Sequence, residues 1–169
     1  MRKLNVLLTV ILLLVFTNCN SDDDASPQNT LSGFQAIIEG EIVDFEYSGG
    51  ASMNSDGRQL SIPGIDNEGN QINIFIGEND MNAPVLTEGV YTANSNNTVS
   101  FAIDAANTFP NTQLFLIGGN NGSGEIIIEN LDNESNIVTI KFSGVAGDNN
   151  GNTLQFSEGI AENIPFESF

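Results

Sequence analysis

Acidic and amide side chains recur at alternate positions in four segments of the sequence, a spacing that could bind a divalent cation. The four sets are Asp66, Glu68 and Asn70; Glu78, Asp80 and Asn82; Asp132, Glu134 and Asn136; and Asp148, Asn150 and Asn152. Ca²⁺ takes about six to eight oxygen ligands, which alternate side chains of a tight loop can supply. None of the four sets continues with the glycine at the sixth position and the glutamate at the twelfth that an EF-type loop requires.

Asp and Asn residues in turns commonly accept hydrogen bonds from the backbone of their own loop. We therefore predict no dedicated metal site in these segments. The side chains kept as metal candidates are Asp66, Glu68, Asp132, Glu134, Asp148 and Asn150.

Pairs of carboxylates could also act as the acid and base of a glycosidase, and Glu39 with Glu41 or Glu125 with Glu129 would be such pairs. In a chain with 22 acidic residues, however, such pairs are expected by chance. A glycosidase also needs a cleft that raises the pKa of one acid. The sequence contains no histidine, which excludes a Ser-His-Asp triad, a histidine general base and zinc held by imidazole. We predict no catalytic residue, no cofactor and no enzymatic activity.

The charge of the chain restricts its partners. Its 169 residues include 22 Asp and Glu against 4 Lys and Arg. Two of the basic residues, Arg2 and Lys3, precede an apolar run that we expect to be removed, which leaves a side-chain charge of 2 − 22 = −20. Because no basic patch could replace the counterions of a phosphate backbone, we predict that the protein does not bind nucleic acid.

The first 18 residues have the pattern of an export signal. Arg2 and Lys3 give a positive start, and the run from Val6 to Phe16 is apolar except for Thr9. A helix of these residues spans about 16 Å at about 1.5 Å per residue, whereas the hydrocarbon core of a bilayer is about 30 Å thick. The run is therefore short for a membrane span and typical of a signal peptide.

The signal ends in Phe16-Thr17-Asn18-Cys19, which resembles the lipobox of a bacterial lipoprotein. The resemblance implies that Cys19 carries a diacylglyceryl group, that the chain is cut before it and that the new amino terminus can be acylated with palmitate. Residue 18 departs from the usual Gly, Ala or Ser at this position. Because two or three acyl chains hold a protein stably on a membrane, this anchor would attach the domain without embedding it.

An acidic, proline-containing segment follows the cysteine and is typical of a solvated tether. Its Ser21-Asp22-Asp23-Asp24 run is similar to the acidic signal of surface-exposed lipoproteins in Bacteroidetes-type bacteria. The resemblance implies attachment to the outer membrane, with the cell surface favoured over the periplasmic face. The expected organisation is a signal peptide at 1–18, a lipidated cysteine and tether at 19–32, and one β domain at 33–169.

Beyond residue 31 the apolar residues alternate with polar ones, and Gly, Asn, Asp and Ser fill the gaps. This period of two predicts strands. The expected strands cover 34–38, 43–47, 60–62, 72–76, 99–103, 114–117, 126–128, 138–142 and 154–156. Tyr47 is expected on the core side, while 104–108 and 159–163 could form single helical turns. We predict an all-β antiparallel sandwich or barrel of about nine strands.

Two further observations concern relatedness. Five of the eleven positions in 66–76 are identical to those in 132–142, which turn chemistry alone could select or an internal duplication could explain. The chain beyond the tether resembles a family of small Bacteroidetes-type lipoproteins of unknown function. The resemblance rests on the segments Phe34-x-Ala36-x-Ile38-x-Gly40, Gly89-Val90-Tyr91, Gly124-x-Ile126-x-Ile128, Phe142-x-Gly144 and Phe156 to Phe166. The resemblance implies a β-sandwich or barrel on a lipid tether and carries over no catalytic residue.

The sequence thus predicts a non-enzymatic binding or accessory module of the cell envelope, with a protein or glycan partner and a lipid anchor. The alternative is a structural envelope protein whose acidic surface binds divalent cations such as Ca²⁺, or a partner protein. The absence of Trp, with Tyr47 and Tyr91 as the only Tyr residues, disfavours sugar binding by aromatic stacking.

Overall fold

The computed structural model describes residues 33–48, 50–77, 82–103, 113–119 and 122–169. Within these ranges the chain forms twelve strands and no helix, so the predicted all-β class is confirmed. The strands are β1 (Phe34–Ile38), β2 (Glu41–Asp44), β3 (Glu46–Tyr47), β4 (Ala51–Met53), β5 (Gln59–Ile65), β6 (Gln71–Gly77), β7 (Gly89–Thr92), β8 (Thr98–Ile103), β9 (Gln113–Ile117), β10 (Ser123–Asp132), β11 (Ile137–Gly147) and β12 (Thr153–Ser168). No helix long and apolar enough to cross a membrane occurs in this part of the chain.

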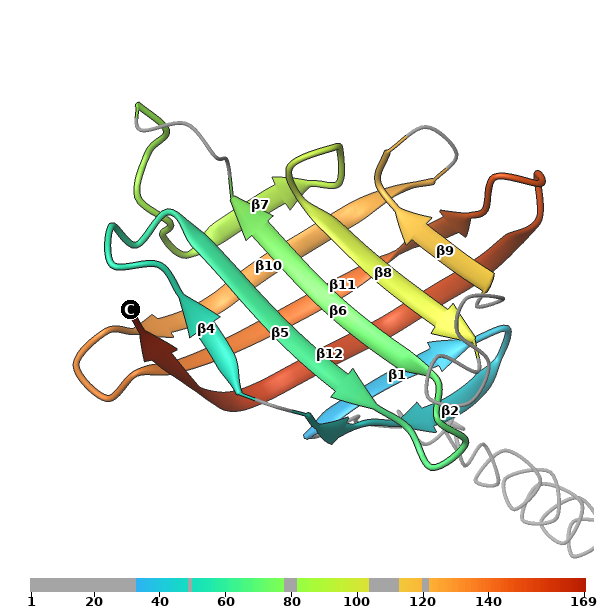
Figure 1. The fold of residues 1–169 in the computed structure, drawn as a ribbon, viewed down its shortest axis with the longest axis horizontal. Helices are drawn as coiled ribbons and strands as arrows, with labels where there is room; N and C mark the ends of the chain where they lie inside the picture. Colours follow the sequence, from blue (N-terminus) through green and yellow to red (C-terminus); the bar gives the residue numbers. More distant parts are fainter. Residues whose placement is uncertain (1–32, 49, 78–81, 104–112, 120–121) are drawn as a thin grey trace, which may run out of the picture. The chain divides into compact units, whose positions relative to one another are not determined.

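The strands pair in the order β2-β1-β12-β4-β5-β6-β8-β9-β11-β10-β7, while β3 pairs with β5. An additional pairing between β11 and β12 closes a circuit through β4, β5, β6, β8 and β9. Figure 1 shows β5, β6, β8 and β9 crossing in front of β10, β11 and β12. The apolar core therefore lies between two layers of one continuous hydrogen-bonded sheet.

The C-terminal strand β12 holds this circuit together because both of its edges are paired. One edge pairs with β11, and the other pairs with β1 and then with β4. The β12–β4 pairing is parallel, with Phe166 opposite Ala51, whereas the other pairings are antiparallel. The sheet is thus mixed. This parallel pair joins segments far apart in the sequence, and β4 is too short for its alternation to indicate a strand.

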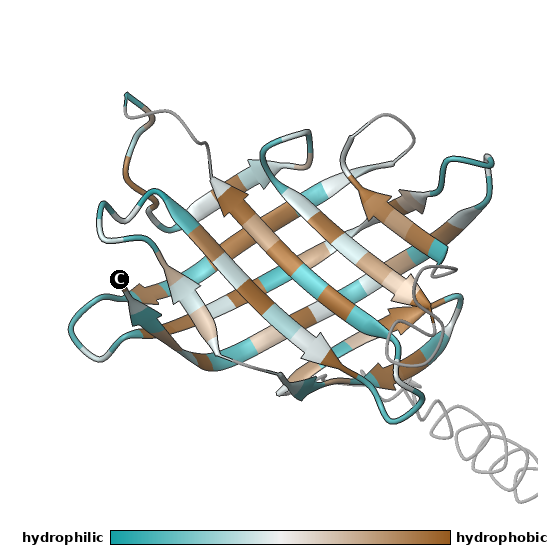
Figure 2. Cartoon of the chain, viewed as in Figure 1, coloured by the Kyte–Doolittle hydropathy of each residue, from teal (hydrophilic) through white to brown (hydrophobic). Residues whose placement is uncertain are grey.

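The predicted alternation accounts for the core. In β6, Ile72, Ile74 and Ile76 are buried, and the residues between them point outward. Figure 2 shows the same alternation of brown and paler segments along the front strands. Each fully buried side chain of this size contributes about 1.5–3 kcal/mol of transfer free energy. The core needs no disulfide, in keeping with the single cysteine of the sequence.

Four phenylalanines form a chain of ring contacts through the core. The centroid of Phe45 lies 5.3 Å from that of Phe34 and 6.2 Å from that of Phe101, and the Phe101 and Phe156 centroids are 5.6 Å apart. The Phe34 and Phe45 rings are tilted by 48°, and the other two pairs are edge-on, an arrangement that contributes about 0.5–1.5 kcal/mol beyond area burial. The chain of rings links β1, the β2–β3 junction, β8 and β12.

The predicted count of nine strands was too low. The predicted strand at 43–47 is divided at Phe45 into β2 and β3, and β4 and β7 were not predicted. The segment at 159–163, which the sequence offered only as a candidate for a single helical turn, belongs to β12. Two bulges interrupt the alternation of β12, because Glu158 and Asn163 adopt positive φ and the register against β11 shifts at both places. The sequence pattern therefore did not predict the full length of this strand.

Tyr47 was predicted to be a core residue, but 36% of it is exposed. It pairs with the buried Gly64 and so shares the inward side of the sheet. It lies at the margin of the sheet, where its hydroxyl donates a 2.8 Å hydrogen bond to the carbonyl oxygen of Pro165. Alternation predicted its side correctly, but not that the sheet ends there.

Candidate functional site

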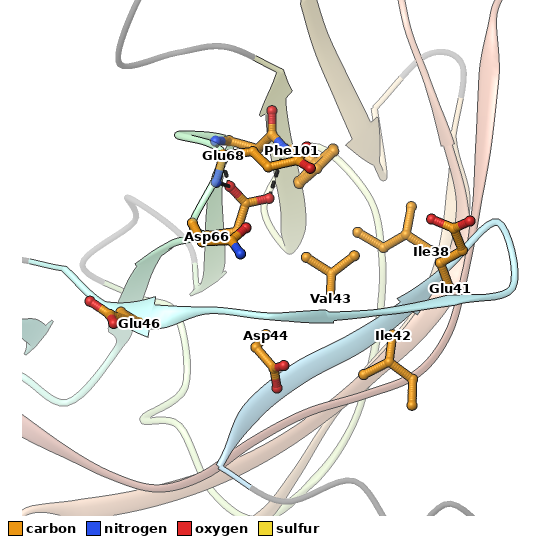
Figure 3. Close-up of a pocket in the computed structure, with 11 residues that line it drawn as sticks. Ile38, Glu41, Ile42, Val43, Asp44, Glu46, Asp66, Glu68 and Phe101 are labelled. Atoms are coloured by element: carbon orange, nitrogen blue, oxygen red, sulfur yellow. Dashed lines mark hydrogen bonds between the residues drawn. The ribbon is translucent and has the colours of Figure 1, made fainter.

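A pocket of about 460 Å³ lies between the β1–β2 hairpin and the turn that joins β5 to β6 (Figure 3). It is lined by Ile38, Glu41, Ile42, Val43, Asp44, Glu46, Asp66, Asn67, Glu68, Asn70 and Phe101. Five of these side chains are carboxylates, and none is a Lys or Arg. The size is within the range of pockets that hold small organic ligands, about 300–1,000 Å³.

The floor of the pocket is apolar. Ile38 and Phe101 are buried, and Val43 is half-buried and packs against the core. Figure 3 shows Val43 on the side of β2 that faces the Asp66 turn, with Ile42 and Asp44 on the other side. Strand alternation therefore divides the acidic side chains of the hairpin between two faces.

Asp66 is committed to its own turn. One carboxylate oxygen accepts hydrogen bonds from the backbone N–H groups of Glu68 at 2.9 Å and Asn70 at 2.8 Å. The other accepts a 2.7 Å hydrogen bond from the Asn70 side-chain amide. Asp66 is 9% exposed, so these bonds compensate for the burial of its charge. It shapes the pocket wall, while the other four lining carboxylates, which belong to Glu41, Asp44, Glu46 and Glu68, are exposed.

Asp44 and Glu39 are likewise held by neighbouring groups. The side-chain amide of Gln35, directly across the β1–β2 pair, donates to the Asp44 carboxylate. Glu39, at positive φ in the hairpin turn, accepts a hydrogen bond from the backbone N–H of Gln155. Glu41 lines the pocket and Glu39 does not, so the structure does not bring these two acids, considered above as a possible pair, together there.

The other two acids considered above as a possible pair lie on β10, away from the pocket. Glu125 is opposite Thr92 of β7. Glu129 forms an exposed 2.7 Å ion pair with Lys141 of β11. Neither side chain is among those that line the pocket.

Two of the remaining metal candidates, Asp132 and Asp148, have carboxylates that accept hydrogen bonds from their own loops. Asp132 accepts hydrogen bonds from the backbone N–H groups of Glu134 and Ser135, and these bonds, that of Ser135 above all, lower its pKa. Among the described residues, no group of three or more Asp, Glu, Cys or His side chains could hold a metal ion. Residues 78–81, which include Glu78 and Asp80 of the second set, and Cys19 lie outside the described residues.

Asp148 is more deeply buried than the other loop acids, with 3% of its surface exposed. It accepts backbone hydrogen bonds from Asn150 and Asn152, and side-chain bonds from Asn152 and from Gln113 of β9. Burial by itself would raise the pKa of this carboxyl, but the bonds from Asn152, Gln113 and Asn150 outweigh it and hold the pKa well below its ordinary value. Asp148 is therefore a structural anion.

The turn at 66–70 matches the turn at 148–152, not the turn at 132–136 that the sequence comparison paired with it. In both 66–70 and 148–152, the Asp accepts from the backbone at i+2 and i+4 and from the side chain of the Asn at i+4. Both turns also place a glycine at positive φ at i+3. The same turn type thus joins β5 to β6 and β11 to β12, although the sequence comparison did not pair these two segments. This favours turn chemistry, not an internal duplication, as the cause of the similarity between 66–76 and 132–142.

No curated protein and no solved structure matches the chain. A family model, a domain of unknown function designated DUF6252, matches residues 32–165, which include all of β1 to β11 and most of β12. The match covers well over half of the chain. The chain therefore belongs to the DUF6252 family.

Proposed function

We propose that the protein is a lipid-anchored, non-enzymatic binding module of the bacterial cell envelope whose acidic pocket takes a cationic ligand with an apolar body. The anchor would be Cys19, in a lipoprotein of the Bacteroidetes type, and the location the outer membrane, with the cell surface favoured. The sequence pattern of residues 1–24 supports this location. The observation that carries the binding proposal is the pocket of about 460 Å³ with five carboxylate residues and no basic residue in its lining.

The charge of the pocket favours a cation. Low-dielectric walls lined by one sign of charge focus the electrostatic potential and concentrate counterions. The acids of the rest of the chain act in the same direction, since the net charge is −18 for the full sequence. A basic side chain of a partner protein or a small organic amine would satisfy this potential.

The arrangement of the acids favours an organic cation over a metal ion. Glu41 and Glu68 lie on opposite elements around an apolar floor, and Asp66 is engaged by its own turn. Ca²⁺ needs several oxygens converging on one point. An aliphatic amine instead places its methylene groups on Ile38 and Val43 and its charge at the rim.

The pocket offers no nucleophile other than its carboxylates. Its lining contains no Ser, Thr, Cys, Tyr or Lys that could act as a nucleophile, and the chain has no His. Carboxylates remain as the only ionisable groups there.

Isothermal titration calorimetry with spermidine at low salt tests the pocket. We expect binding to wild type that weakens with added NaCl, because exposed charges are screened. Each exposed charge pair contributes about 0.2–1 kcal/mol, so the double variant Glu41→Gln/Glu68→Gln should bind about 2- to 30-fold more weakly.

The matched control is Glu125→Gln/Glu129→Gln, which removes two exposed acids from β10 and should leave affinity unchanged. An equal loss in both double variants would mean that spermidine senses only the net charge and would overturn the pocket proposal. Stronger heats with CaCl₂ than with spermidine would favour the divalent-cation alternative.

A further inference from the structure

The outward face of β4, β5, β6, β8 and β9 carries no charged side chain at twelve positions that pair directly across the strands. The positions form three rows: Ser52, Ser61, Phe75 and Thr98; Pro63, Asn73, Ser100 and Leu116; and Ile65, Gln71, Ala102 and Leu114. Their sequence neighbours in the strands point inward and form the core. We call these twelve residues the neutral face. Glu46, which pairs with Ile65, marks one corner.

Composition alone does not explain this neutrality. The outward side of the other layer carries Glu125, Glu129 and Lys141 on β10 and β11, with Glu162 on β12. Glu167, which pairs with Ser52, borders the neutral face at a second corner. A solvent-exposed layer ordinarily bears charges, and this chain has 22 acidic residues to place. Their absence from twelve neighbouring positions distinguishes this face from the outward side of β10 and β11.

Asn73 lies at the centre of the neutral face and offers a positioned donor. The Ser61 hydroxyl donates a 2.9 Å hydrogen bond to Asn73 Oδ1, which fixes the orientation of the amide. The Ser100 hydroxyl donates to the carbonyl oxygen of Asn73 at 3.4 Å. Asn73 Nδ2 has no hydrogen-bond acceptor within the described part of the chain, so its protons are available to a ligand.

A hollow of about 170 Å³ lies on the same side of the sheet around Asn73, between Pro63, Gln71, Ser100 and Ala102. The small side chains of Ser100 and Ala102 leave this space, and the exposed Gln71 amide adds neutral donor and acceptor groups at its edge. Apolar surface flanks it, since Leu114 is 48% exposed and Phe75 is half-buried. The combination suits a ligand that is uncharged, rich in hydroxyl groups and apolar on its C–H faces.

The area of the neutral face favours a small ligand over a second protein. Each of the three rows spans four strands about 4.8 Å apart, and the rows are about 6.8 Å apart, so the twelve positions cover about 400 Å². A standard protein interface buries about 800 Å² on each partner. A second copy of the chain would also bring its own large negative charge close to the first. Both considerations disfavour a dimer here.

We propose that the neutral face binds a neutral glycan chain, with Asn73 as the central hydrogen-bonding residue. Neutral hydroxyl groups match the uncharged amides and hydroxyls of the face. The apolar side chains pack against sugar C–H groups without a Trp platform. The hollow and the acidic pocket share no lining residue. The glycan proposal and the cation proposal can therefore be tested independently.

Native gel electrophoresis in the presence of soluble dextran, mannan or xylan tests the proposal. We expect at least one of these neutral polysaccharides to retard wild type. Asn73→Asp should raise the apparent dissociation constant about tenfold, because a positioned hydrogen-bond donor is replaced by a charged acceptor. Asn73→Asp keeps the acceptor for Ser61, so the fold should persist. Leu114→Glu, which places a charge on an exposed side chain of the face, provides a second variant with the same expectation.

Two controls separate this site from the rest of the molecule. Glu125→Gln on the other layer should leave retardation unchanged, and so should the pocket variant Glu41→Gln/Glu68→Gln, although it loses spermidine affinity. Absence of retardation by all three polysaccharides would overturn the proposal. A wild-type dimer in gel filtration that Asn73→Asp converts to a monomer would also overturn it, by identifying the face as a self-interface.

Discussion

The carboxylate of Asp148 accepts a 2.9 Å hydrogen bond from the side-chain amide of Gln113, which ties the β11–β12 hairpin to the start of β9. Beside it, the pairing of Gly147 with Leu116 joins the two layers on this side of the sheet. The buried Asp148 carboxylate thus stabilises the short pairing of β9 with β11, where the circuit of strands closes.

Replacing Asp148 by Asn should destabilise the protein at neutral pH, because Nδ2 cannot accept the bonds that Asn150, Asn152 and Gln113 donate. The folded-state pKa of Asp148 is lowered, so its stabilising contribution is present above the unfolded pKa of about 3.9 and is lost as pH falls toward the folded value. Urea unfolding at pH 7 and pH 3 should show a smaller pH dependence for the variant than for wild type. An equal change in unfolding free energy between pH 7 and pH 3 for wild type and variant would contradict a stabilising role of the Asp148 carboxylate. Glu125→Gln serves as the charge-matched control.

Truncating Phe156 to Ala should remove about 3–5 kcal/mol of unfolding free energy, because the side chain is fully buried and its ring contacts Phe101 edge-on. Phe169→Ala, at a residue that is 76% exposed, should change stability by less than about 0.5 kcal/mol. Equilibrium denaturation in urea measures both. Similar losses in the two variants would argue against the ring chain as a core element.

Adding a methyl group at Gly159 should destabilise the fold by about 1–3 kcal/mol through overpacking. A Cβ at this position would lie 2.4 Å from a ring carbon of Phe142, which the neighbouring strand holds in the core. Gly159→Ala and the same-strand control Ser157→Ala can be compared by thermal unfolding. If Gly159→Ala matched the control, the close approach of β12 to the Phe142 ring would be wrong.

Replacing Cys19 by Ala should release the protein from the membrane fraction, because the only thiol in the sequence would no longer carry acyl chains. Fractionation of cells expressing wild type and Cys19→Ala, with radiolabelled palmitate as a direct readout, measures the effect. The control Thr17→Ala should remain in the membrane fraction and incorporate label. Persistence of unlabelled wild-type protein in that fraction would point to another mode of attachment.

Much of the local structure was readable from the sequence. The alternation of Ile72, Ile74 and Ile76 predicted both the strand and its buried side. Asp66 and Asp148, each followed by Gly at i+3 and Asn at i+4, were correctly interpreted as turn formers, since the side chain of Asp reaches its own backbone within four residues. Local hydrogen bonding and a period of two are properties of a short stretch of chain, which is why one sequence suffices for them.

Only the tertiary structure decided how these pieces meet. The parallel pairing of β12 with β4, the bulges at Glu158 and Asn163, and the closure of the circuit by β11 and β12 join residues far apart in the chain. The same long-range register places Asn73 between Pro63 and Ser100 and gathers the carboxylates around the pocket. Side-chain chemistry is local, but the neighbours across a sheet are selected by the packing of the whole core, so both candidate sites emerge only once the strands are paired.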